Sequence, residues 1–462
     1  PRTISGFLNQ VGAEEAMTAD QVVWSEQGRL HLSYKGHIAD ATQQTGNSNE
    51  EGGTFEIDTD IDGNSVGTSS VDHGIRVNDM VLVADASATA QGLVTAVSND
   101  QISIALYNAG NTTATFANAG LAAGSGDSAT ILVYGSEFKK GDNYNGSTSR
   151  QANEPQFKSF QNKPIIMKDY YEVSGSDASR VGWVEVSAED GTSGYLWYLK
   201  AASDTRARFT DYLEMAMLES KMGGGSNAGA TGHPVVSAAD LTDDAFDLTA
   251  DTATGTQGLF DAIETRGNVS SGILGSSTPP VNLAEFDAIL AEFDKQGAIE
   301  ENMLFCNRDT SLAIDDMLAG MNSYGANGTS YGVFDNSEDM ALNLGFSGFR
   351  RGSYDFYKSD FRYLNDLATR GGINAAAGSN AIRGVFIPAG SSSVYDQTVG
   401  QSIRRPFLHV RFRASQTDDR RMKTWVTGSV GAATSALDAM QLHFLSERCL
   451  VTQGANNFML LK

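Results

Sequence analysis

The segment from residue 156 to residue 221 joins an extended aromatic run directly to a long helical pattern. Residues 156–176 read QFKSFQNKPIIMKDYYEVSGS, with lysine and aromatic residues interleaved along an expected strand. Residues 195–221 repeat apolar side chains at helical spacing and predict a helix of roughly 40 Å. Its expected apolar face carries Leu199, Ala202, Phe209, Leu213 and Ala216, with Tyr212 beside them. We interpret the pair as a shape that lies across a neighbouring molecule.

The composition fits a folded, acidic chain of two or three domains. Of its 462 residues, 40% are hydrophobic and 19% are charged, which supplies apolar material for separate cores. The net charge of -23 makes the chain a poor general ligand for nucleic acid or anionic membranes. No stretch reaches the eighteen or so apolar residues of a membrane helix. Cys306 and Cys449 have no metal-binding or redox spacing and suit a reducing cytoplasm.

The charges are distributed unevenly along the chain. Between His37 and Phe138 the only Lys or Arg is Arg76, whereas residues 350–423 contain thirteen Lys or Arg against six Asp. We expect this basic segment to pair with acidic parts of the chain, within or between subunits. A nucleic-acid surface is the weaker interpretation because exposed aromatic residues are not interleaved with the arginines. A non-specific phosphate contact stays open.

The N-terminal third divides into an arm and a β domain. Residues 1–50 are polar and predict an arm that is disordered or ordered by a partner, with a short helix from Glu14 to Val23. Residues 51–137 contain short β-branched runs separated by Asp, Asn and Ser, which predict a small antiparallel barrel or sandwich. The expected strands are 75–83, 92–97, 101–106 and 129–134, and a further strand is expected at 181–186.

The C-terminal half predicts helices and then strands. Helices are expected at 259–266, at 283–296 with Asn282 as a candidate N-cap and Gly297 as the stop, and at 309–318. The expected strands are 303–306, 354–357, 383–387, 407–413, 422–430, 444–451 and 458–461. In residues 407–413 the basic and apolar side chains alternate, so one strand face is basic and the other apolar.

Two short motifs suggest chemistry, and each has a simpler explanation. Asp58, Asp60 and Asp62 open like a calcium loop, but the closing Glu and the flanking helices are missing. A solvated acidic turn therefore explains them better. Ser65 lies in a G-x-S-x-G match, yet a nucleophile elbow needs a strand before it and a helix after it. We therefore assign no catalytic residue and no cofactor.

The order of these parts resembles the major capsid proteins of tailed bacteriophages, which have the Hong Kong 97-type capsid fold. The resemblance is carried by residues 162–175, which begin NKPIIMK and end VSG, and by residues 211–218, which read DYLEMAML. The helices and strands expected downstream follow in the same order. The resemblance covers about residues 150–462, and the β domain is extra to the minimal fold.

The resemblance implies an α+β fold in six parts. These are an N-terminal arm (1–50), an inserted β-barrel or sandwich domain (51–137), an extended loop (138–194), a spine helix (195–222), an axial domain (223–345), and a peripheral domain with the C-terminal strands (346–462). In that fold the extended loop lies over the adjacent subunit. We therefore assign the subunit interface to Lys158, Phe160, Lys163, Lys168, Tyr170, Tyr171, Arg404, Arg405, Arg411 and Arg413. Deleting residues 158–172 is expected to leave a folded subunit that builds no stable shells.

The implied function is self-assembly into an icosahedral head. Its partners would be copies of itself in hexamers and pentamers, non-specifically packaged double-stranded DNA, and separate scaffolding, portal and decoration proteins. The chain would be a virion component assembled in the host cytoplasm. Two alternatives stay open: a surface-layer, tail or adhesion-type structural protein with a β module, and a hydrolase that uses the Asp58–Asp62 loop or Ser65.

Overall fold

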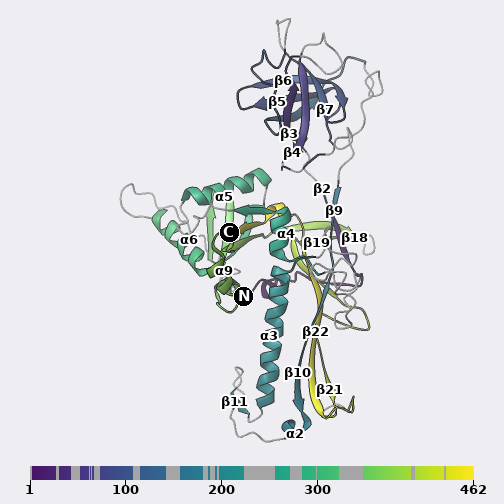
Figure 1. Cartoon of the computed structure of the whole chain (residues 1–462), viewed down its shortest axis with the longest axis vertical. Coiled ribbons are helices and arrows are strands. Elements are labelled where there is room, and N and C mark those ends of the chain that lie inside the picture. The colour runs from purple at the N-terminus through teal and green to yellow at the C-terminus, as the bar shows by residue number, and fades with distance from the viewer. Residues whose placement is uncertain are drawn as a thin grey trace, which may run out of the picture. The chain divides into compact units, whose positions relative to one another are not determined.

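The computed structural model describes residues 3–27, 31–42, 52–61, 63, 65–66, 73–107, 115–141, 157–179, 186–187, 193–194, 197–222, 255–270, 283–297, 299–321, 347–396, 401–430 and 433–462. The chain forms two compact units (Figure 1). Unit 1 consists of Pro1–Trp24 and Ser159–Lys462, and unit 2 consists of Ser25–Lys158. Unit 2 is thus inserted into the sequence of unit 1.

Unit 2 is a closed antiparallel barrel with strand order β3-β4-β7-β6-β5-β8. The strands are β3 (Ser33–Asp40), β4 (Gly53–Asp60), β5 (Asp79–Asp85), β6 (Thr89–Ser98), β7 (Gln101–Leu106) and β8 (Ala129–Ser136). Alternate side chains point inward, so Ile38, Phe55, Val81 and Ile104 are fully buried. The four strands expected in residues 75–134 are confirmed within a few residues.

The expected boundary between arm and β domain at residue 50 is wrong. Strand β3 belongs to the barrel, where it pairs with both β4 and β8. Without β3 the barrel would have two open edges, and Ile38 at 0% exposure would lose its place in the core. The residues around β3 are polar, so the sequence pattern did not predict this strand of the barrel.

Unit 1 contains a six-stranded mixed sheet with order β13-β23-β17-β14-β16-β15. The strands are β13 (Asn268–Ser270), β14 (Glu301–Cys306), β15 (Ser347–Arg351), β16 (Tyr354–Asp360), β17 (Gly384–Pro388) and β23 (Met459–Leu461). Strands from both expected domains, 223–345 and 346–462, therefore share one sheet. The expected division at residue 345 is wrong because β14 pairs with both β16 and β17.

Helices cover both faces of this sheet. Phe286 and Phe293 of α5 (Leu283–Gln296) and Ile314 of α6 (Arg308–Met321) pack on one face, around Phe356. The opposite face packs against α1 (Ile4–Gln10), α4 (Leu259–Arg266) and the end of α3 (Trp197–Glu219). The expected helices at 195–221, 259–266, 283–296 and 309–318 are confirmed in the described residues. Gly297, at φ +63°, takes the left-handed conformation that ends α5.

A second sheet of unit 1 has the order β1-β20-β22-β10, with β21 also paired to β22. Its strands are β1 (Glu14–Met17), β10 (Ile165–Ser174), β20 (Leu408–Arg413), β21 (Lys423–Gly428) and β22 (Ala439–Thr452). Helix α3 runs beside β10 and β22 (Figure 1). We call α3 together with β10, β22 and β21 the α3 layer.

The remaining elements of unit 1 are short. They are α2 (Gly175–Ala178), β11 (Val186–Ser187), β12 (Ser193–Gly194), α8 (Arg362–Asn365), α9 (Arg370–Ala377), β18 (Ser391–Asp396), β19 (Gln401–Pro406) and two 3-10 turns, Gly378–Asn380 and Ala455–Asn457. Strands β2 (Val22–Gln27) and β9 (Phe157–Asn162) pair where the chain leaves and re-enters unit 1. The expected strand at 181–186 and the N-cap Asn282 lie outside the described residues, apart from Val186 at the start of β11.

The expected helix from Glu14 to Val23 is wrong. These residues form β1 and the start of β2, and the helix of this region is α1, nearer the N-terminus. Strand β1 extends the second sheet by parallel pairing with β20. Tertiary pairing has overridden a weak local helical pattern here.

Candidate intersubunit surfaces

Three aromatic rings form a stack across the sheet of the α3 layer. The strand register places Tyr170 of β10 and Trp425 of β21 on either side of His443 in β22. The ring centroids of Tyr170 and His443 are 6.1 Å apart, and those of His443 and Trp425 are 5.0 Å apart, with near-parallel planes. Cross-strand pairs of this kind hold a sheet together and also give it a flat, rigid surface.

This stack lies on the side of the sheet that faces away from α3. Side chains alternate along a strand, and Leu442 and Phe444 beside His443 contact the helix. Tyr170 is 58% exposed and Ile166 is 52% exposed. We call this side the outer face, and its residues are Ile166, Lys168, Tyr170, Glu172, Lys423, Trp425, Thr427 and His443. It combines apolar and aromatic area with charges at its rim, as protein interfaces do.

Hydrogen bonds fix the outer face in place. Thr427 bonds His443 Nε2 at 2.7 Å, and the Gln441 amide donates to the Glu172 carboxylate at 2.7 Å. Lys423 pairs with Asp418 at 2.6 Å and lies near the Trp425 ring. A preorganised surface loses little conformational entropy when a partner binds.

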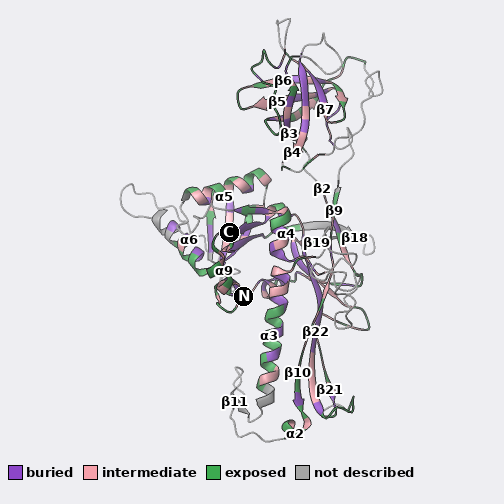
Figure 2. Ribbon diagram, viewed as in Figure 1, coloured by how far each residue is buried: buried purple, intermediate pink, exposed green. Residues whose placement is uncertain are grey.

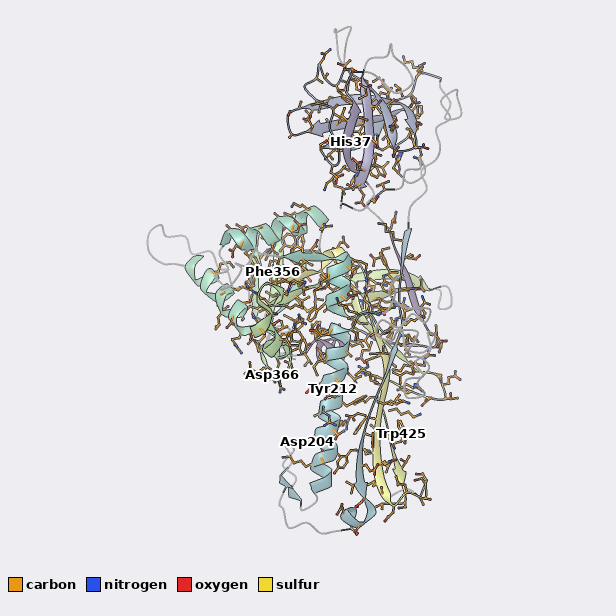
Figure 3. All side chains as sticks on the ribbon, in the orientation of Figure 1. His37, Asp204, Tyr212, Phe356, Asp366 and Trp425 are labelled. Atoms are coloured by element: carbon orange, nitrogen blue, oxygen red, sulfur yellow. The ribbon has the colours of Figure 1, made fainter. Side chains whose placement is uncertain are left out.

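The core between α3 and its sheet is thin. Phe209 and Leu213 of α3 pack on Phe444, with partly buried Met167, Met422 and Leu442 around them. Buried residues recur at four-residue spacing, whereas Asp204, Arg206 and Tyr212 are exposed (Figures 2 and 3). Tyr212 was expected beside the apolar face, and the helix instead presents it to solvent at 45% exposure. The α3 layer thus has exposed surface on both sides.

The N-terminal segment is docked in unit 1 and is not a free arm. Ile4, Phe7 and Leu8 of α1 are 5% exposed or less and belong to the core under the six-stranded sheet. The Glu214 carboxylate of α3 accepts hydrogen bonds from the backbone N–H groups of Ile4, at 2.8 Å, and Ser5, at 2.9 Å. Burial raises the pKa of Glu214. The expectation of an arm that is disordered or ordered by a partner is wrong for residues 3–24.

Asn162 joins three parts of unit 1 from the end of β9. Its side-chain amide donates to the carbonyl oxygens of Gln257, at 3.0 Å, and Leu450, at 2.6 Å. Its side-chain oxygen accepts from the Gln257 and Lys163 backbone N–H groups and from the Thr256 hydroxyl. Asn162 is 1% exposed, so these bonds satisfy a buried amide completely. It opens the NKPIIMK run, but the sequence could not show its distant partners.

A cation–π contact lies next to Asn162. The Arg266 guanidinium of α4 is 4.5 Å from the ring centroid of Phe160 and 5.5 Å from that of Trp24. Phe160 was assigned to the subunit interface, and the structure places it against these two residues, half-buried within its own chain. The contact anchors β2 and β9 to the body of unit 1.

The other ribbon residues assigned to the interface divide between two surfaces. Lys168 and Tyr170 lie on the outer face, whereas Tyr171 is half-buried on the side that faces α3. Lys158 is exposed in β9, and Lys163 is half-buried beside Asn162. The structure therefore brings Lys168 and Tyr170 together on one surface and leaves the others elsewhere.

The extended strand expected in residues 156–176 is confirmed by β9 and β10. The extended loop at 138–194 that lies over an adjacent subunit stays a prediction, although the structure places residues 165–174 in a sheet of their own chain. These ten residues form β10, which pairs with β22 along its whole length. Deleting 158–172 would remove Asn162 and most of the β10–β22 pairing, so that experiment would test the fold of the subunit as well as shell assembly. Single substitutions on the outer face are the appropriate test.

Three of the four assigned arginines are neutralised within the chain. Glu15 of β1 pairs with Arg405 and Arg411, each at 2.9 Å. Glu447 pairs with Arg413 at 2.8 Å, which also reaches Asp20. Arg404 is exposed. The basic segment thus pairs with acidic residues of its own chain, one of the two arrangements that the sequence predicts.

Three buried titratable groups among the described residues of unit 1 are Cys306, Cys449 and His409, and their pKa values are shifted away from those of a nucleophilic centre. Burial raises the pKa of the Cys306 and Cys449 thiols to about 12, so both stay protonated. Burial, together with the charge of Arg411, lowers the pKa of His409 to about 4. These shifts follow from packing inside the two sheets.

The two chemical motifs of the sequence lie in the barrel. His37 Nδ1 contacts the Asp58 carboxylate at 2.7 Å, and Asp62 lies outside the described residues. Among the described residues, no three His, Cys, Asp or Glu side chains gather as metal ligands would. Ser65 forms an isolated antiparallel bridge with Thr59 of β4. Residues 67–72, where the helix of a nucleophile elbow would follow, lie outside the described residues.

Sequence reasoning missed a further exposed apolar surface, on the α8–α9 connection. Leu367 is 81% exposed and Ile373 is 58% exposed, and Asp366 between the two helices is marked in Figure 3. A cavity of about 330 Å³ lies nearby, lined by Arg308, Asp360, Arg362 and Asn365. Arg308 and Asp360 form an ion pair across it at 2.7 Å. No periodic pattern in the sequence marks this region.

Comparisons with known proteins give structural similarities only. No protein family and no curated protein matches the chain. Similar solved structures include the SrpI encapsulin complex of Synechococcus elongatus (7% identity, TM-score 0.33, 69% of this chain and 79% of that one) and the capsid of a native GTA particle (13%, 0.34, 70% and 80%). A structure of Microbacterium phage Oxtober96 also matches (9%, 0.32, 86% and 92%).

One of these similar structures is a capsid, and another is of a phage. TM-scores near 0.3 do not establish a common fold. In the described part of the chain, no helix is both long enough and apolar enough to cross a membrane.

Proposed function

We propose that this chain is a major capsid protein that associates with copies of itself into the closed icosahedral head of a tailed phage. The observation that carries the proposal is the α3 layer. Its own core consists of Phe209, Leu213 and Phe444, yet its surfaces carry Ile166, Tyr170 and other large side chains. A layer this thin gains stability when other copies cover its surfaces.

The two sides of the α3 layer differ, and this difference favours rings. The outer face presents aromatic and apolar side chains, whereas the exposed side of α3 presents Asp204, Arg206, Asp211 and Tyr212. Two unlike surfaces suit head-to-tail contacts, which close into rings when the rotation allows it. Hexamers and pentamers of a shell are rings of this kind.

The other parts of the proposal concern the contents and companions of the shell. A net charge of -23 limits adhesion of DNA to the protein, which suits a container that must release its genome. Double-stranded DNA is the proposed content. Separate scaffolding, portal and decoration proteins are the proposed companions, and assembly takes place in the host cytoplasm.

A second candidate function is a surface-layer, tail or adhesion-type structural protein. The observation that favours it is unit 2, a complete barrel inserted between β2 and β9. A domain with its own hydrophobic core can be inserted into another domain without disturbing it, and such a module could supply the contact surface of an adhesion protein. It would assemble into open sheets or tubes.

Electron microscopy of the purified full chain separates these functions. The chain is expressed with and without a candidate scaffold, and particles are examined by negative staining and analytical ultracentrifugation. Closed shells of uniform diameter are expected. Flat lattices or tubes would favour the second candidate, and a persistent monomer with metal-dependent hydrolysis that Ser65→Ala abolishes would overturn both.

A further inference from the structure

The wall of the barrel contains a hollow where β5, β6 and the end of β7 meet. The cavity has a volume of about 280 Å³. It is open to solvent and lined by the half-buried Leu82 and Leu106 and by the exposed Thr89, Gln91 and Tyr107. This is slightly below the roughly 300–1,000 Å³ of sites for drug-sized ligands, so the cavity suits one small ring.

Hydrogen bonds hold Tyr107 at its backbone and at its hydroxyl, and part of its ring is exposed to solvent. Its backbone N–H donates to the Gln91 carbonyl oxygen at 2.9 Å, which continues the pairing of β6 with β7 beyond Leu106. Its hydroxyl donates to the Glu137 carboxylate, and the Glu137 backbone N–H bonds the Asn78 carbonyl oxygen at 3.0 Å. Tyr107 is nevertheless 47% exposed. A rigid, half-open ring can bind a flat apolar surface at low entropic cost.

The polar groups at the rim suit a ligand with many hydroxyl groups. Thr89 and Gln91 are exposed, and a hydroxyl and an amide can each donate and accept hydrogen bonds. The Glu137 carboxylate, which bonds the Tyr107 hydroxyl, is acceptor-only when ionised. A sugar ring has one apolar face of C–H groups and an edge of hydroxyls, so it matches an aromatic ring beside mixed donors and acceptors.

The acidic charge of the barrel strands disfavours anionic ligands, although the exposed Lys139 and Lys140 follow Glu137 in the same unit. Residues 38–137 contain thirteen Asp or Glu and a single Lys or Arg, which is Arg76. Arg76 is 8% exposed and donates from Nη1 to the carbonyl oxygens of His73 and Ile75. The barrel wall therefore has no exposed Arg or Lys in this stretch for a phosphate or a carboxylate. An acidic surface repels such groups and accepts neutral hydroxyls.

We propose that this cavity binds one ring of a neutral saccharide, with Tyr107 stacked on the ring face and Thr89 and Gln91 bonded to its hydroxyls. The site belongs to unit 2 alone, so it is independent of the capsid proposal. It gives the inserted barrel a function that a shell subunit does not require, which is attachment to a neutral glycan.

Saturation-transfer difference NMR on the full-length chain tests the site, with maltohexaose, cellohexaose and chitohexaose as neutral probes and oligogalacturonate as the anionic probe. At least one neutral probe is expected to receive saturation, whereas the anionic probe is not. Tyr107→Ala should weaken binding about tenfold, in line with the loss of one stacking contact. Tyr107→Phe should retain most of it.

Tyr134→Ala provides the matched control, because Tyr134 is 48% exposed on the same barrel and does not line the cavity. It should leave binding unchanged. Absence of transfer to all three neutral probes would overturn the proposal, as would equal binding of oligogalacturonate. Binding that survives Tyr107→Ala, or that Tyr134→Ala abolishes, would also overturn it.

Discussion

The barrel and the α3 layer bury their apolar side chains to very different extents. Among the described residues, fourteen buried apolar side chains fill the closed barrel, whereas three buried ones form the core between α3 and its sheet. Every barrel strand has two neighbours, while β10, among the described residues, pairs only with β22. The barrel completes its own structure, and the α3 layer has surface left for other molecules to cover.

Because of this difference, the barrel and the α3 layer have different sources of stability and different roles. A closed wall with a full core can be stable by itself and can carry a binding site on its surface. An open layer with an unpaired edge and aromatic side chains on its outer face is stabilised by neighbours. The stability of the barrel should therefore come from contacts within the barrel, whereas the stability of the α3 layer should increase when copies of the chain assemble.

The largest stability change is expected for Phe55→Ala in the barrel. Phe55 is fully buried, so the substitution should cost about 3–5 kcal/mol of the barrel's unfolding free energy. Calorimetry should show the barrel transition at lower temperature and the other transition unchanged. Phe356→Ala, at an equally buried site of the six-stranded sheet marked in Figure 3, should move only the other transition. A shift of both transitions by Phe55→Ala would show that the units are coupled.

Asn162→Ala should rank next, with its effect confined to unit 1. It leaves the Gln257 N–H and the Leu450 carbonyl without their buried partner, which should cost about 3 kcal/mol. Denaturant unfolding followed by tryptophan fluorescence measures the loss. Asn456→Ala is the control, because Asn456 is exposed and uses its backbone carbonyl to bond Asn268. Equal effects of the two variants would contradict the role given to Asn162.

Glu214→Gln should change the pH dependence of stability. Burial raises the pKa of folded Glu214 above its unfolded value, so its contribution is fully present at acidic pH and is lost as pH rises through the folded pKa. The glutamine variant lacks this loss. The variant should therefore become more stable relative to the wild type as the pH rises from 4 to 8, which means that its free energy of unfolding minus that of the wild type should increase. A constant difference across that range would contradict the assignment.

A small change is expected for Glu15→Gln. Its removal leaves Arg405 and Arg411 without their shared carboxylate, at a cost of about 1 kcal/mol that should shrink in high salt. Glu292→Gln removes an exposed pair with Lys295 and should be nearly neutral. Urea titrations of both variants at low and high salt compare the two pairs.

Elements with strong periodicity could be predicted from the sequence. Phe286, Ile289 and Phe293 repeat at spacings of three and four, and the helix they predict is α5. The β-branched runs of the barrel and of the C-terminal sheet also gave their strands. In these regions local pattern and tertiary packing agree.

The surfaces could be predicted only in part, since they depend on contacts between distant residues. Tyr170 and Lys168 were assigned to an interface from their local sequence, but His443 and Trp425 join Tyr170 only through strand register. Glu214 meets α1 across about two hundred residues of sequence. The shared six-stranded sheet likewise arises from strands far apart in the chain. No local spacing encodes such partners.

The most direct test of the central claim is the assembly state of Tyr170→Asp. Tyr170 lies on the outer face and is 58% exposed in the free subunit. An aspartate at this position would be buried only when copies associate, so it should block association, while the free energy of unfolding of the free subunit should fall by at most about 1 kcal/mol. Tyr134→Asp on the barrel is the control. Sedimentation velocity and negative-stain microscopy should show shells for the wild type and the control, and only folded small species for Tyr170→Asp. Normal shells from Tyr170→Asp would contradict the account.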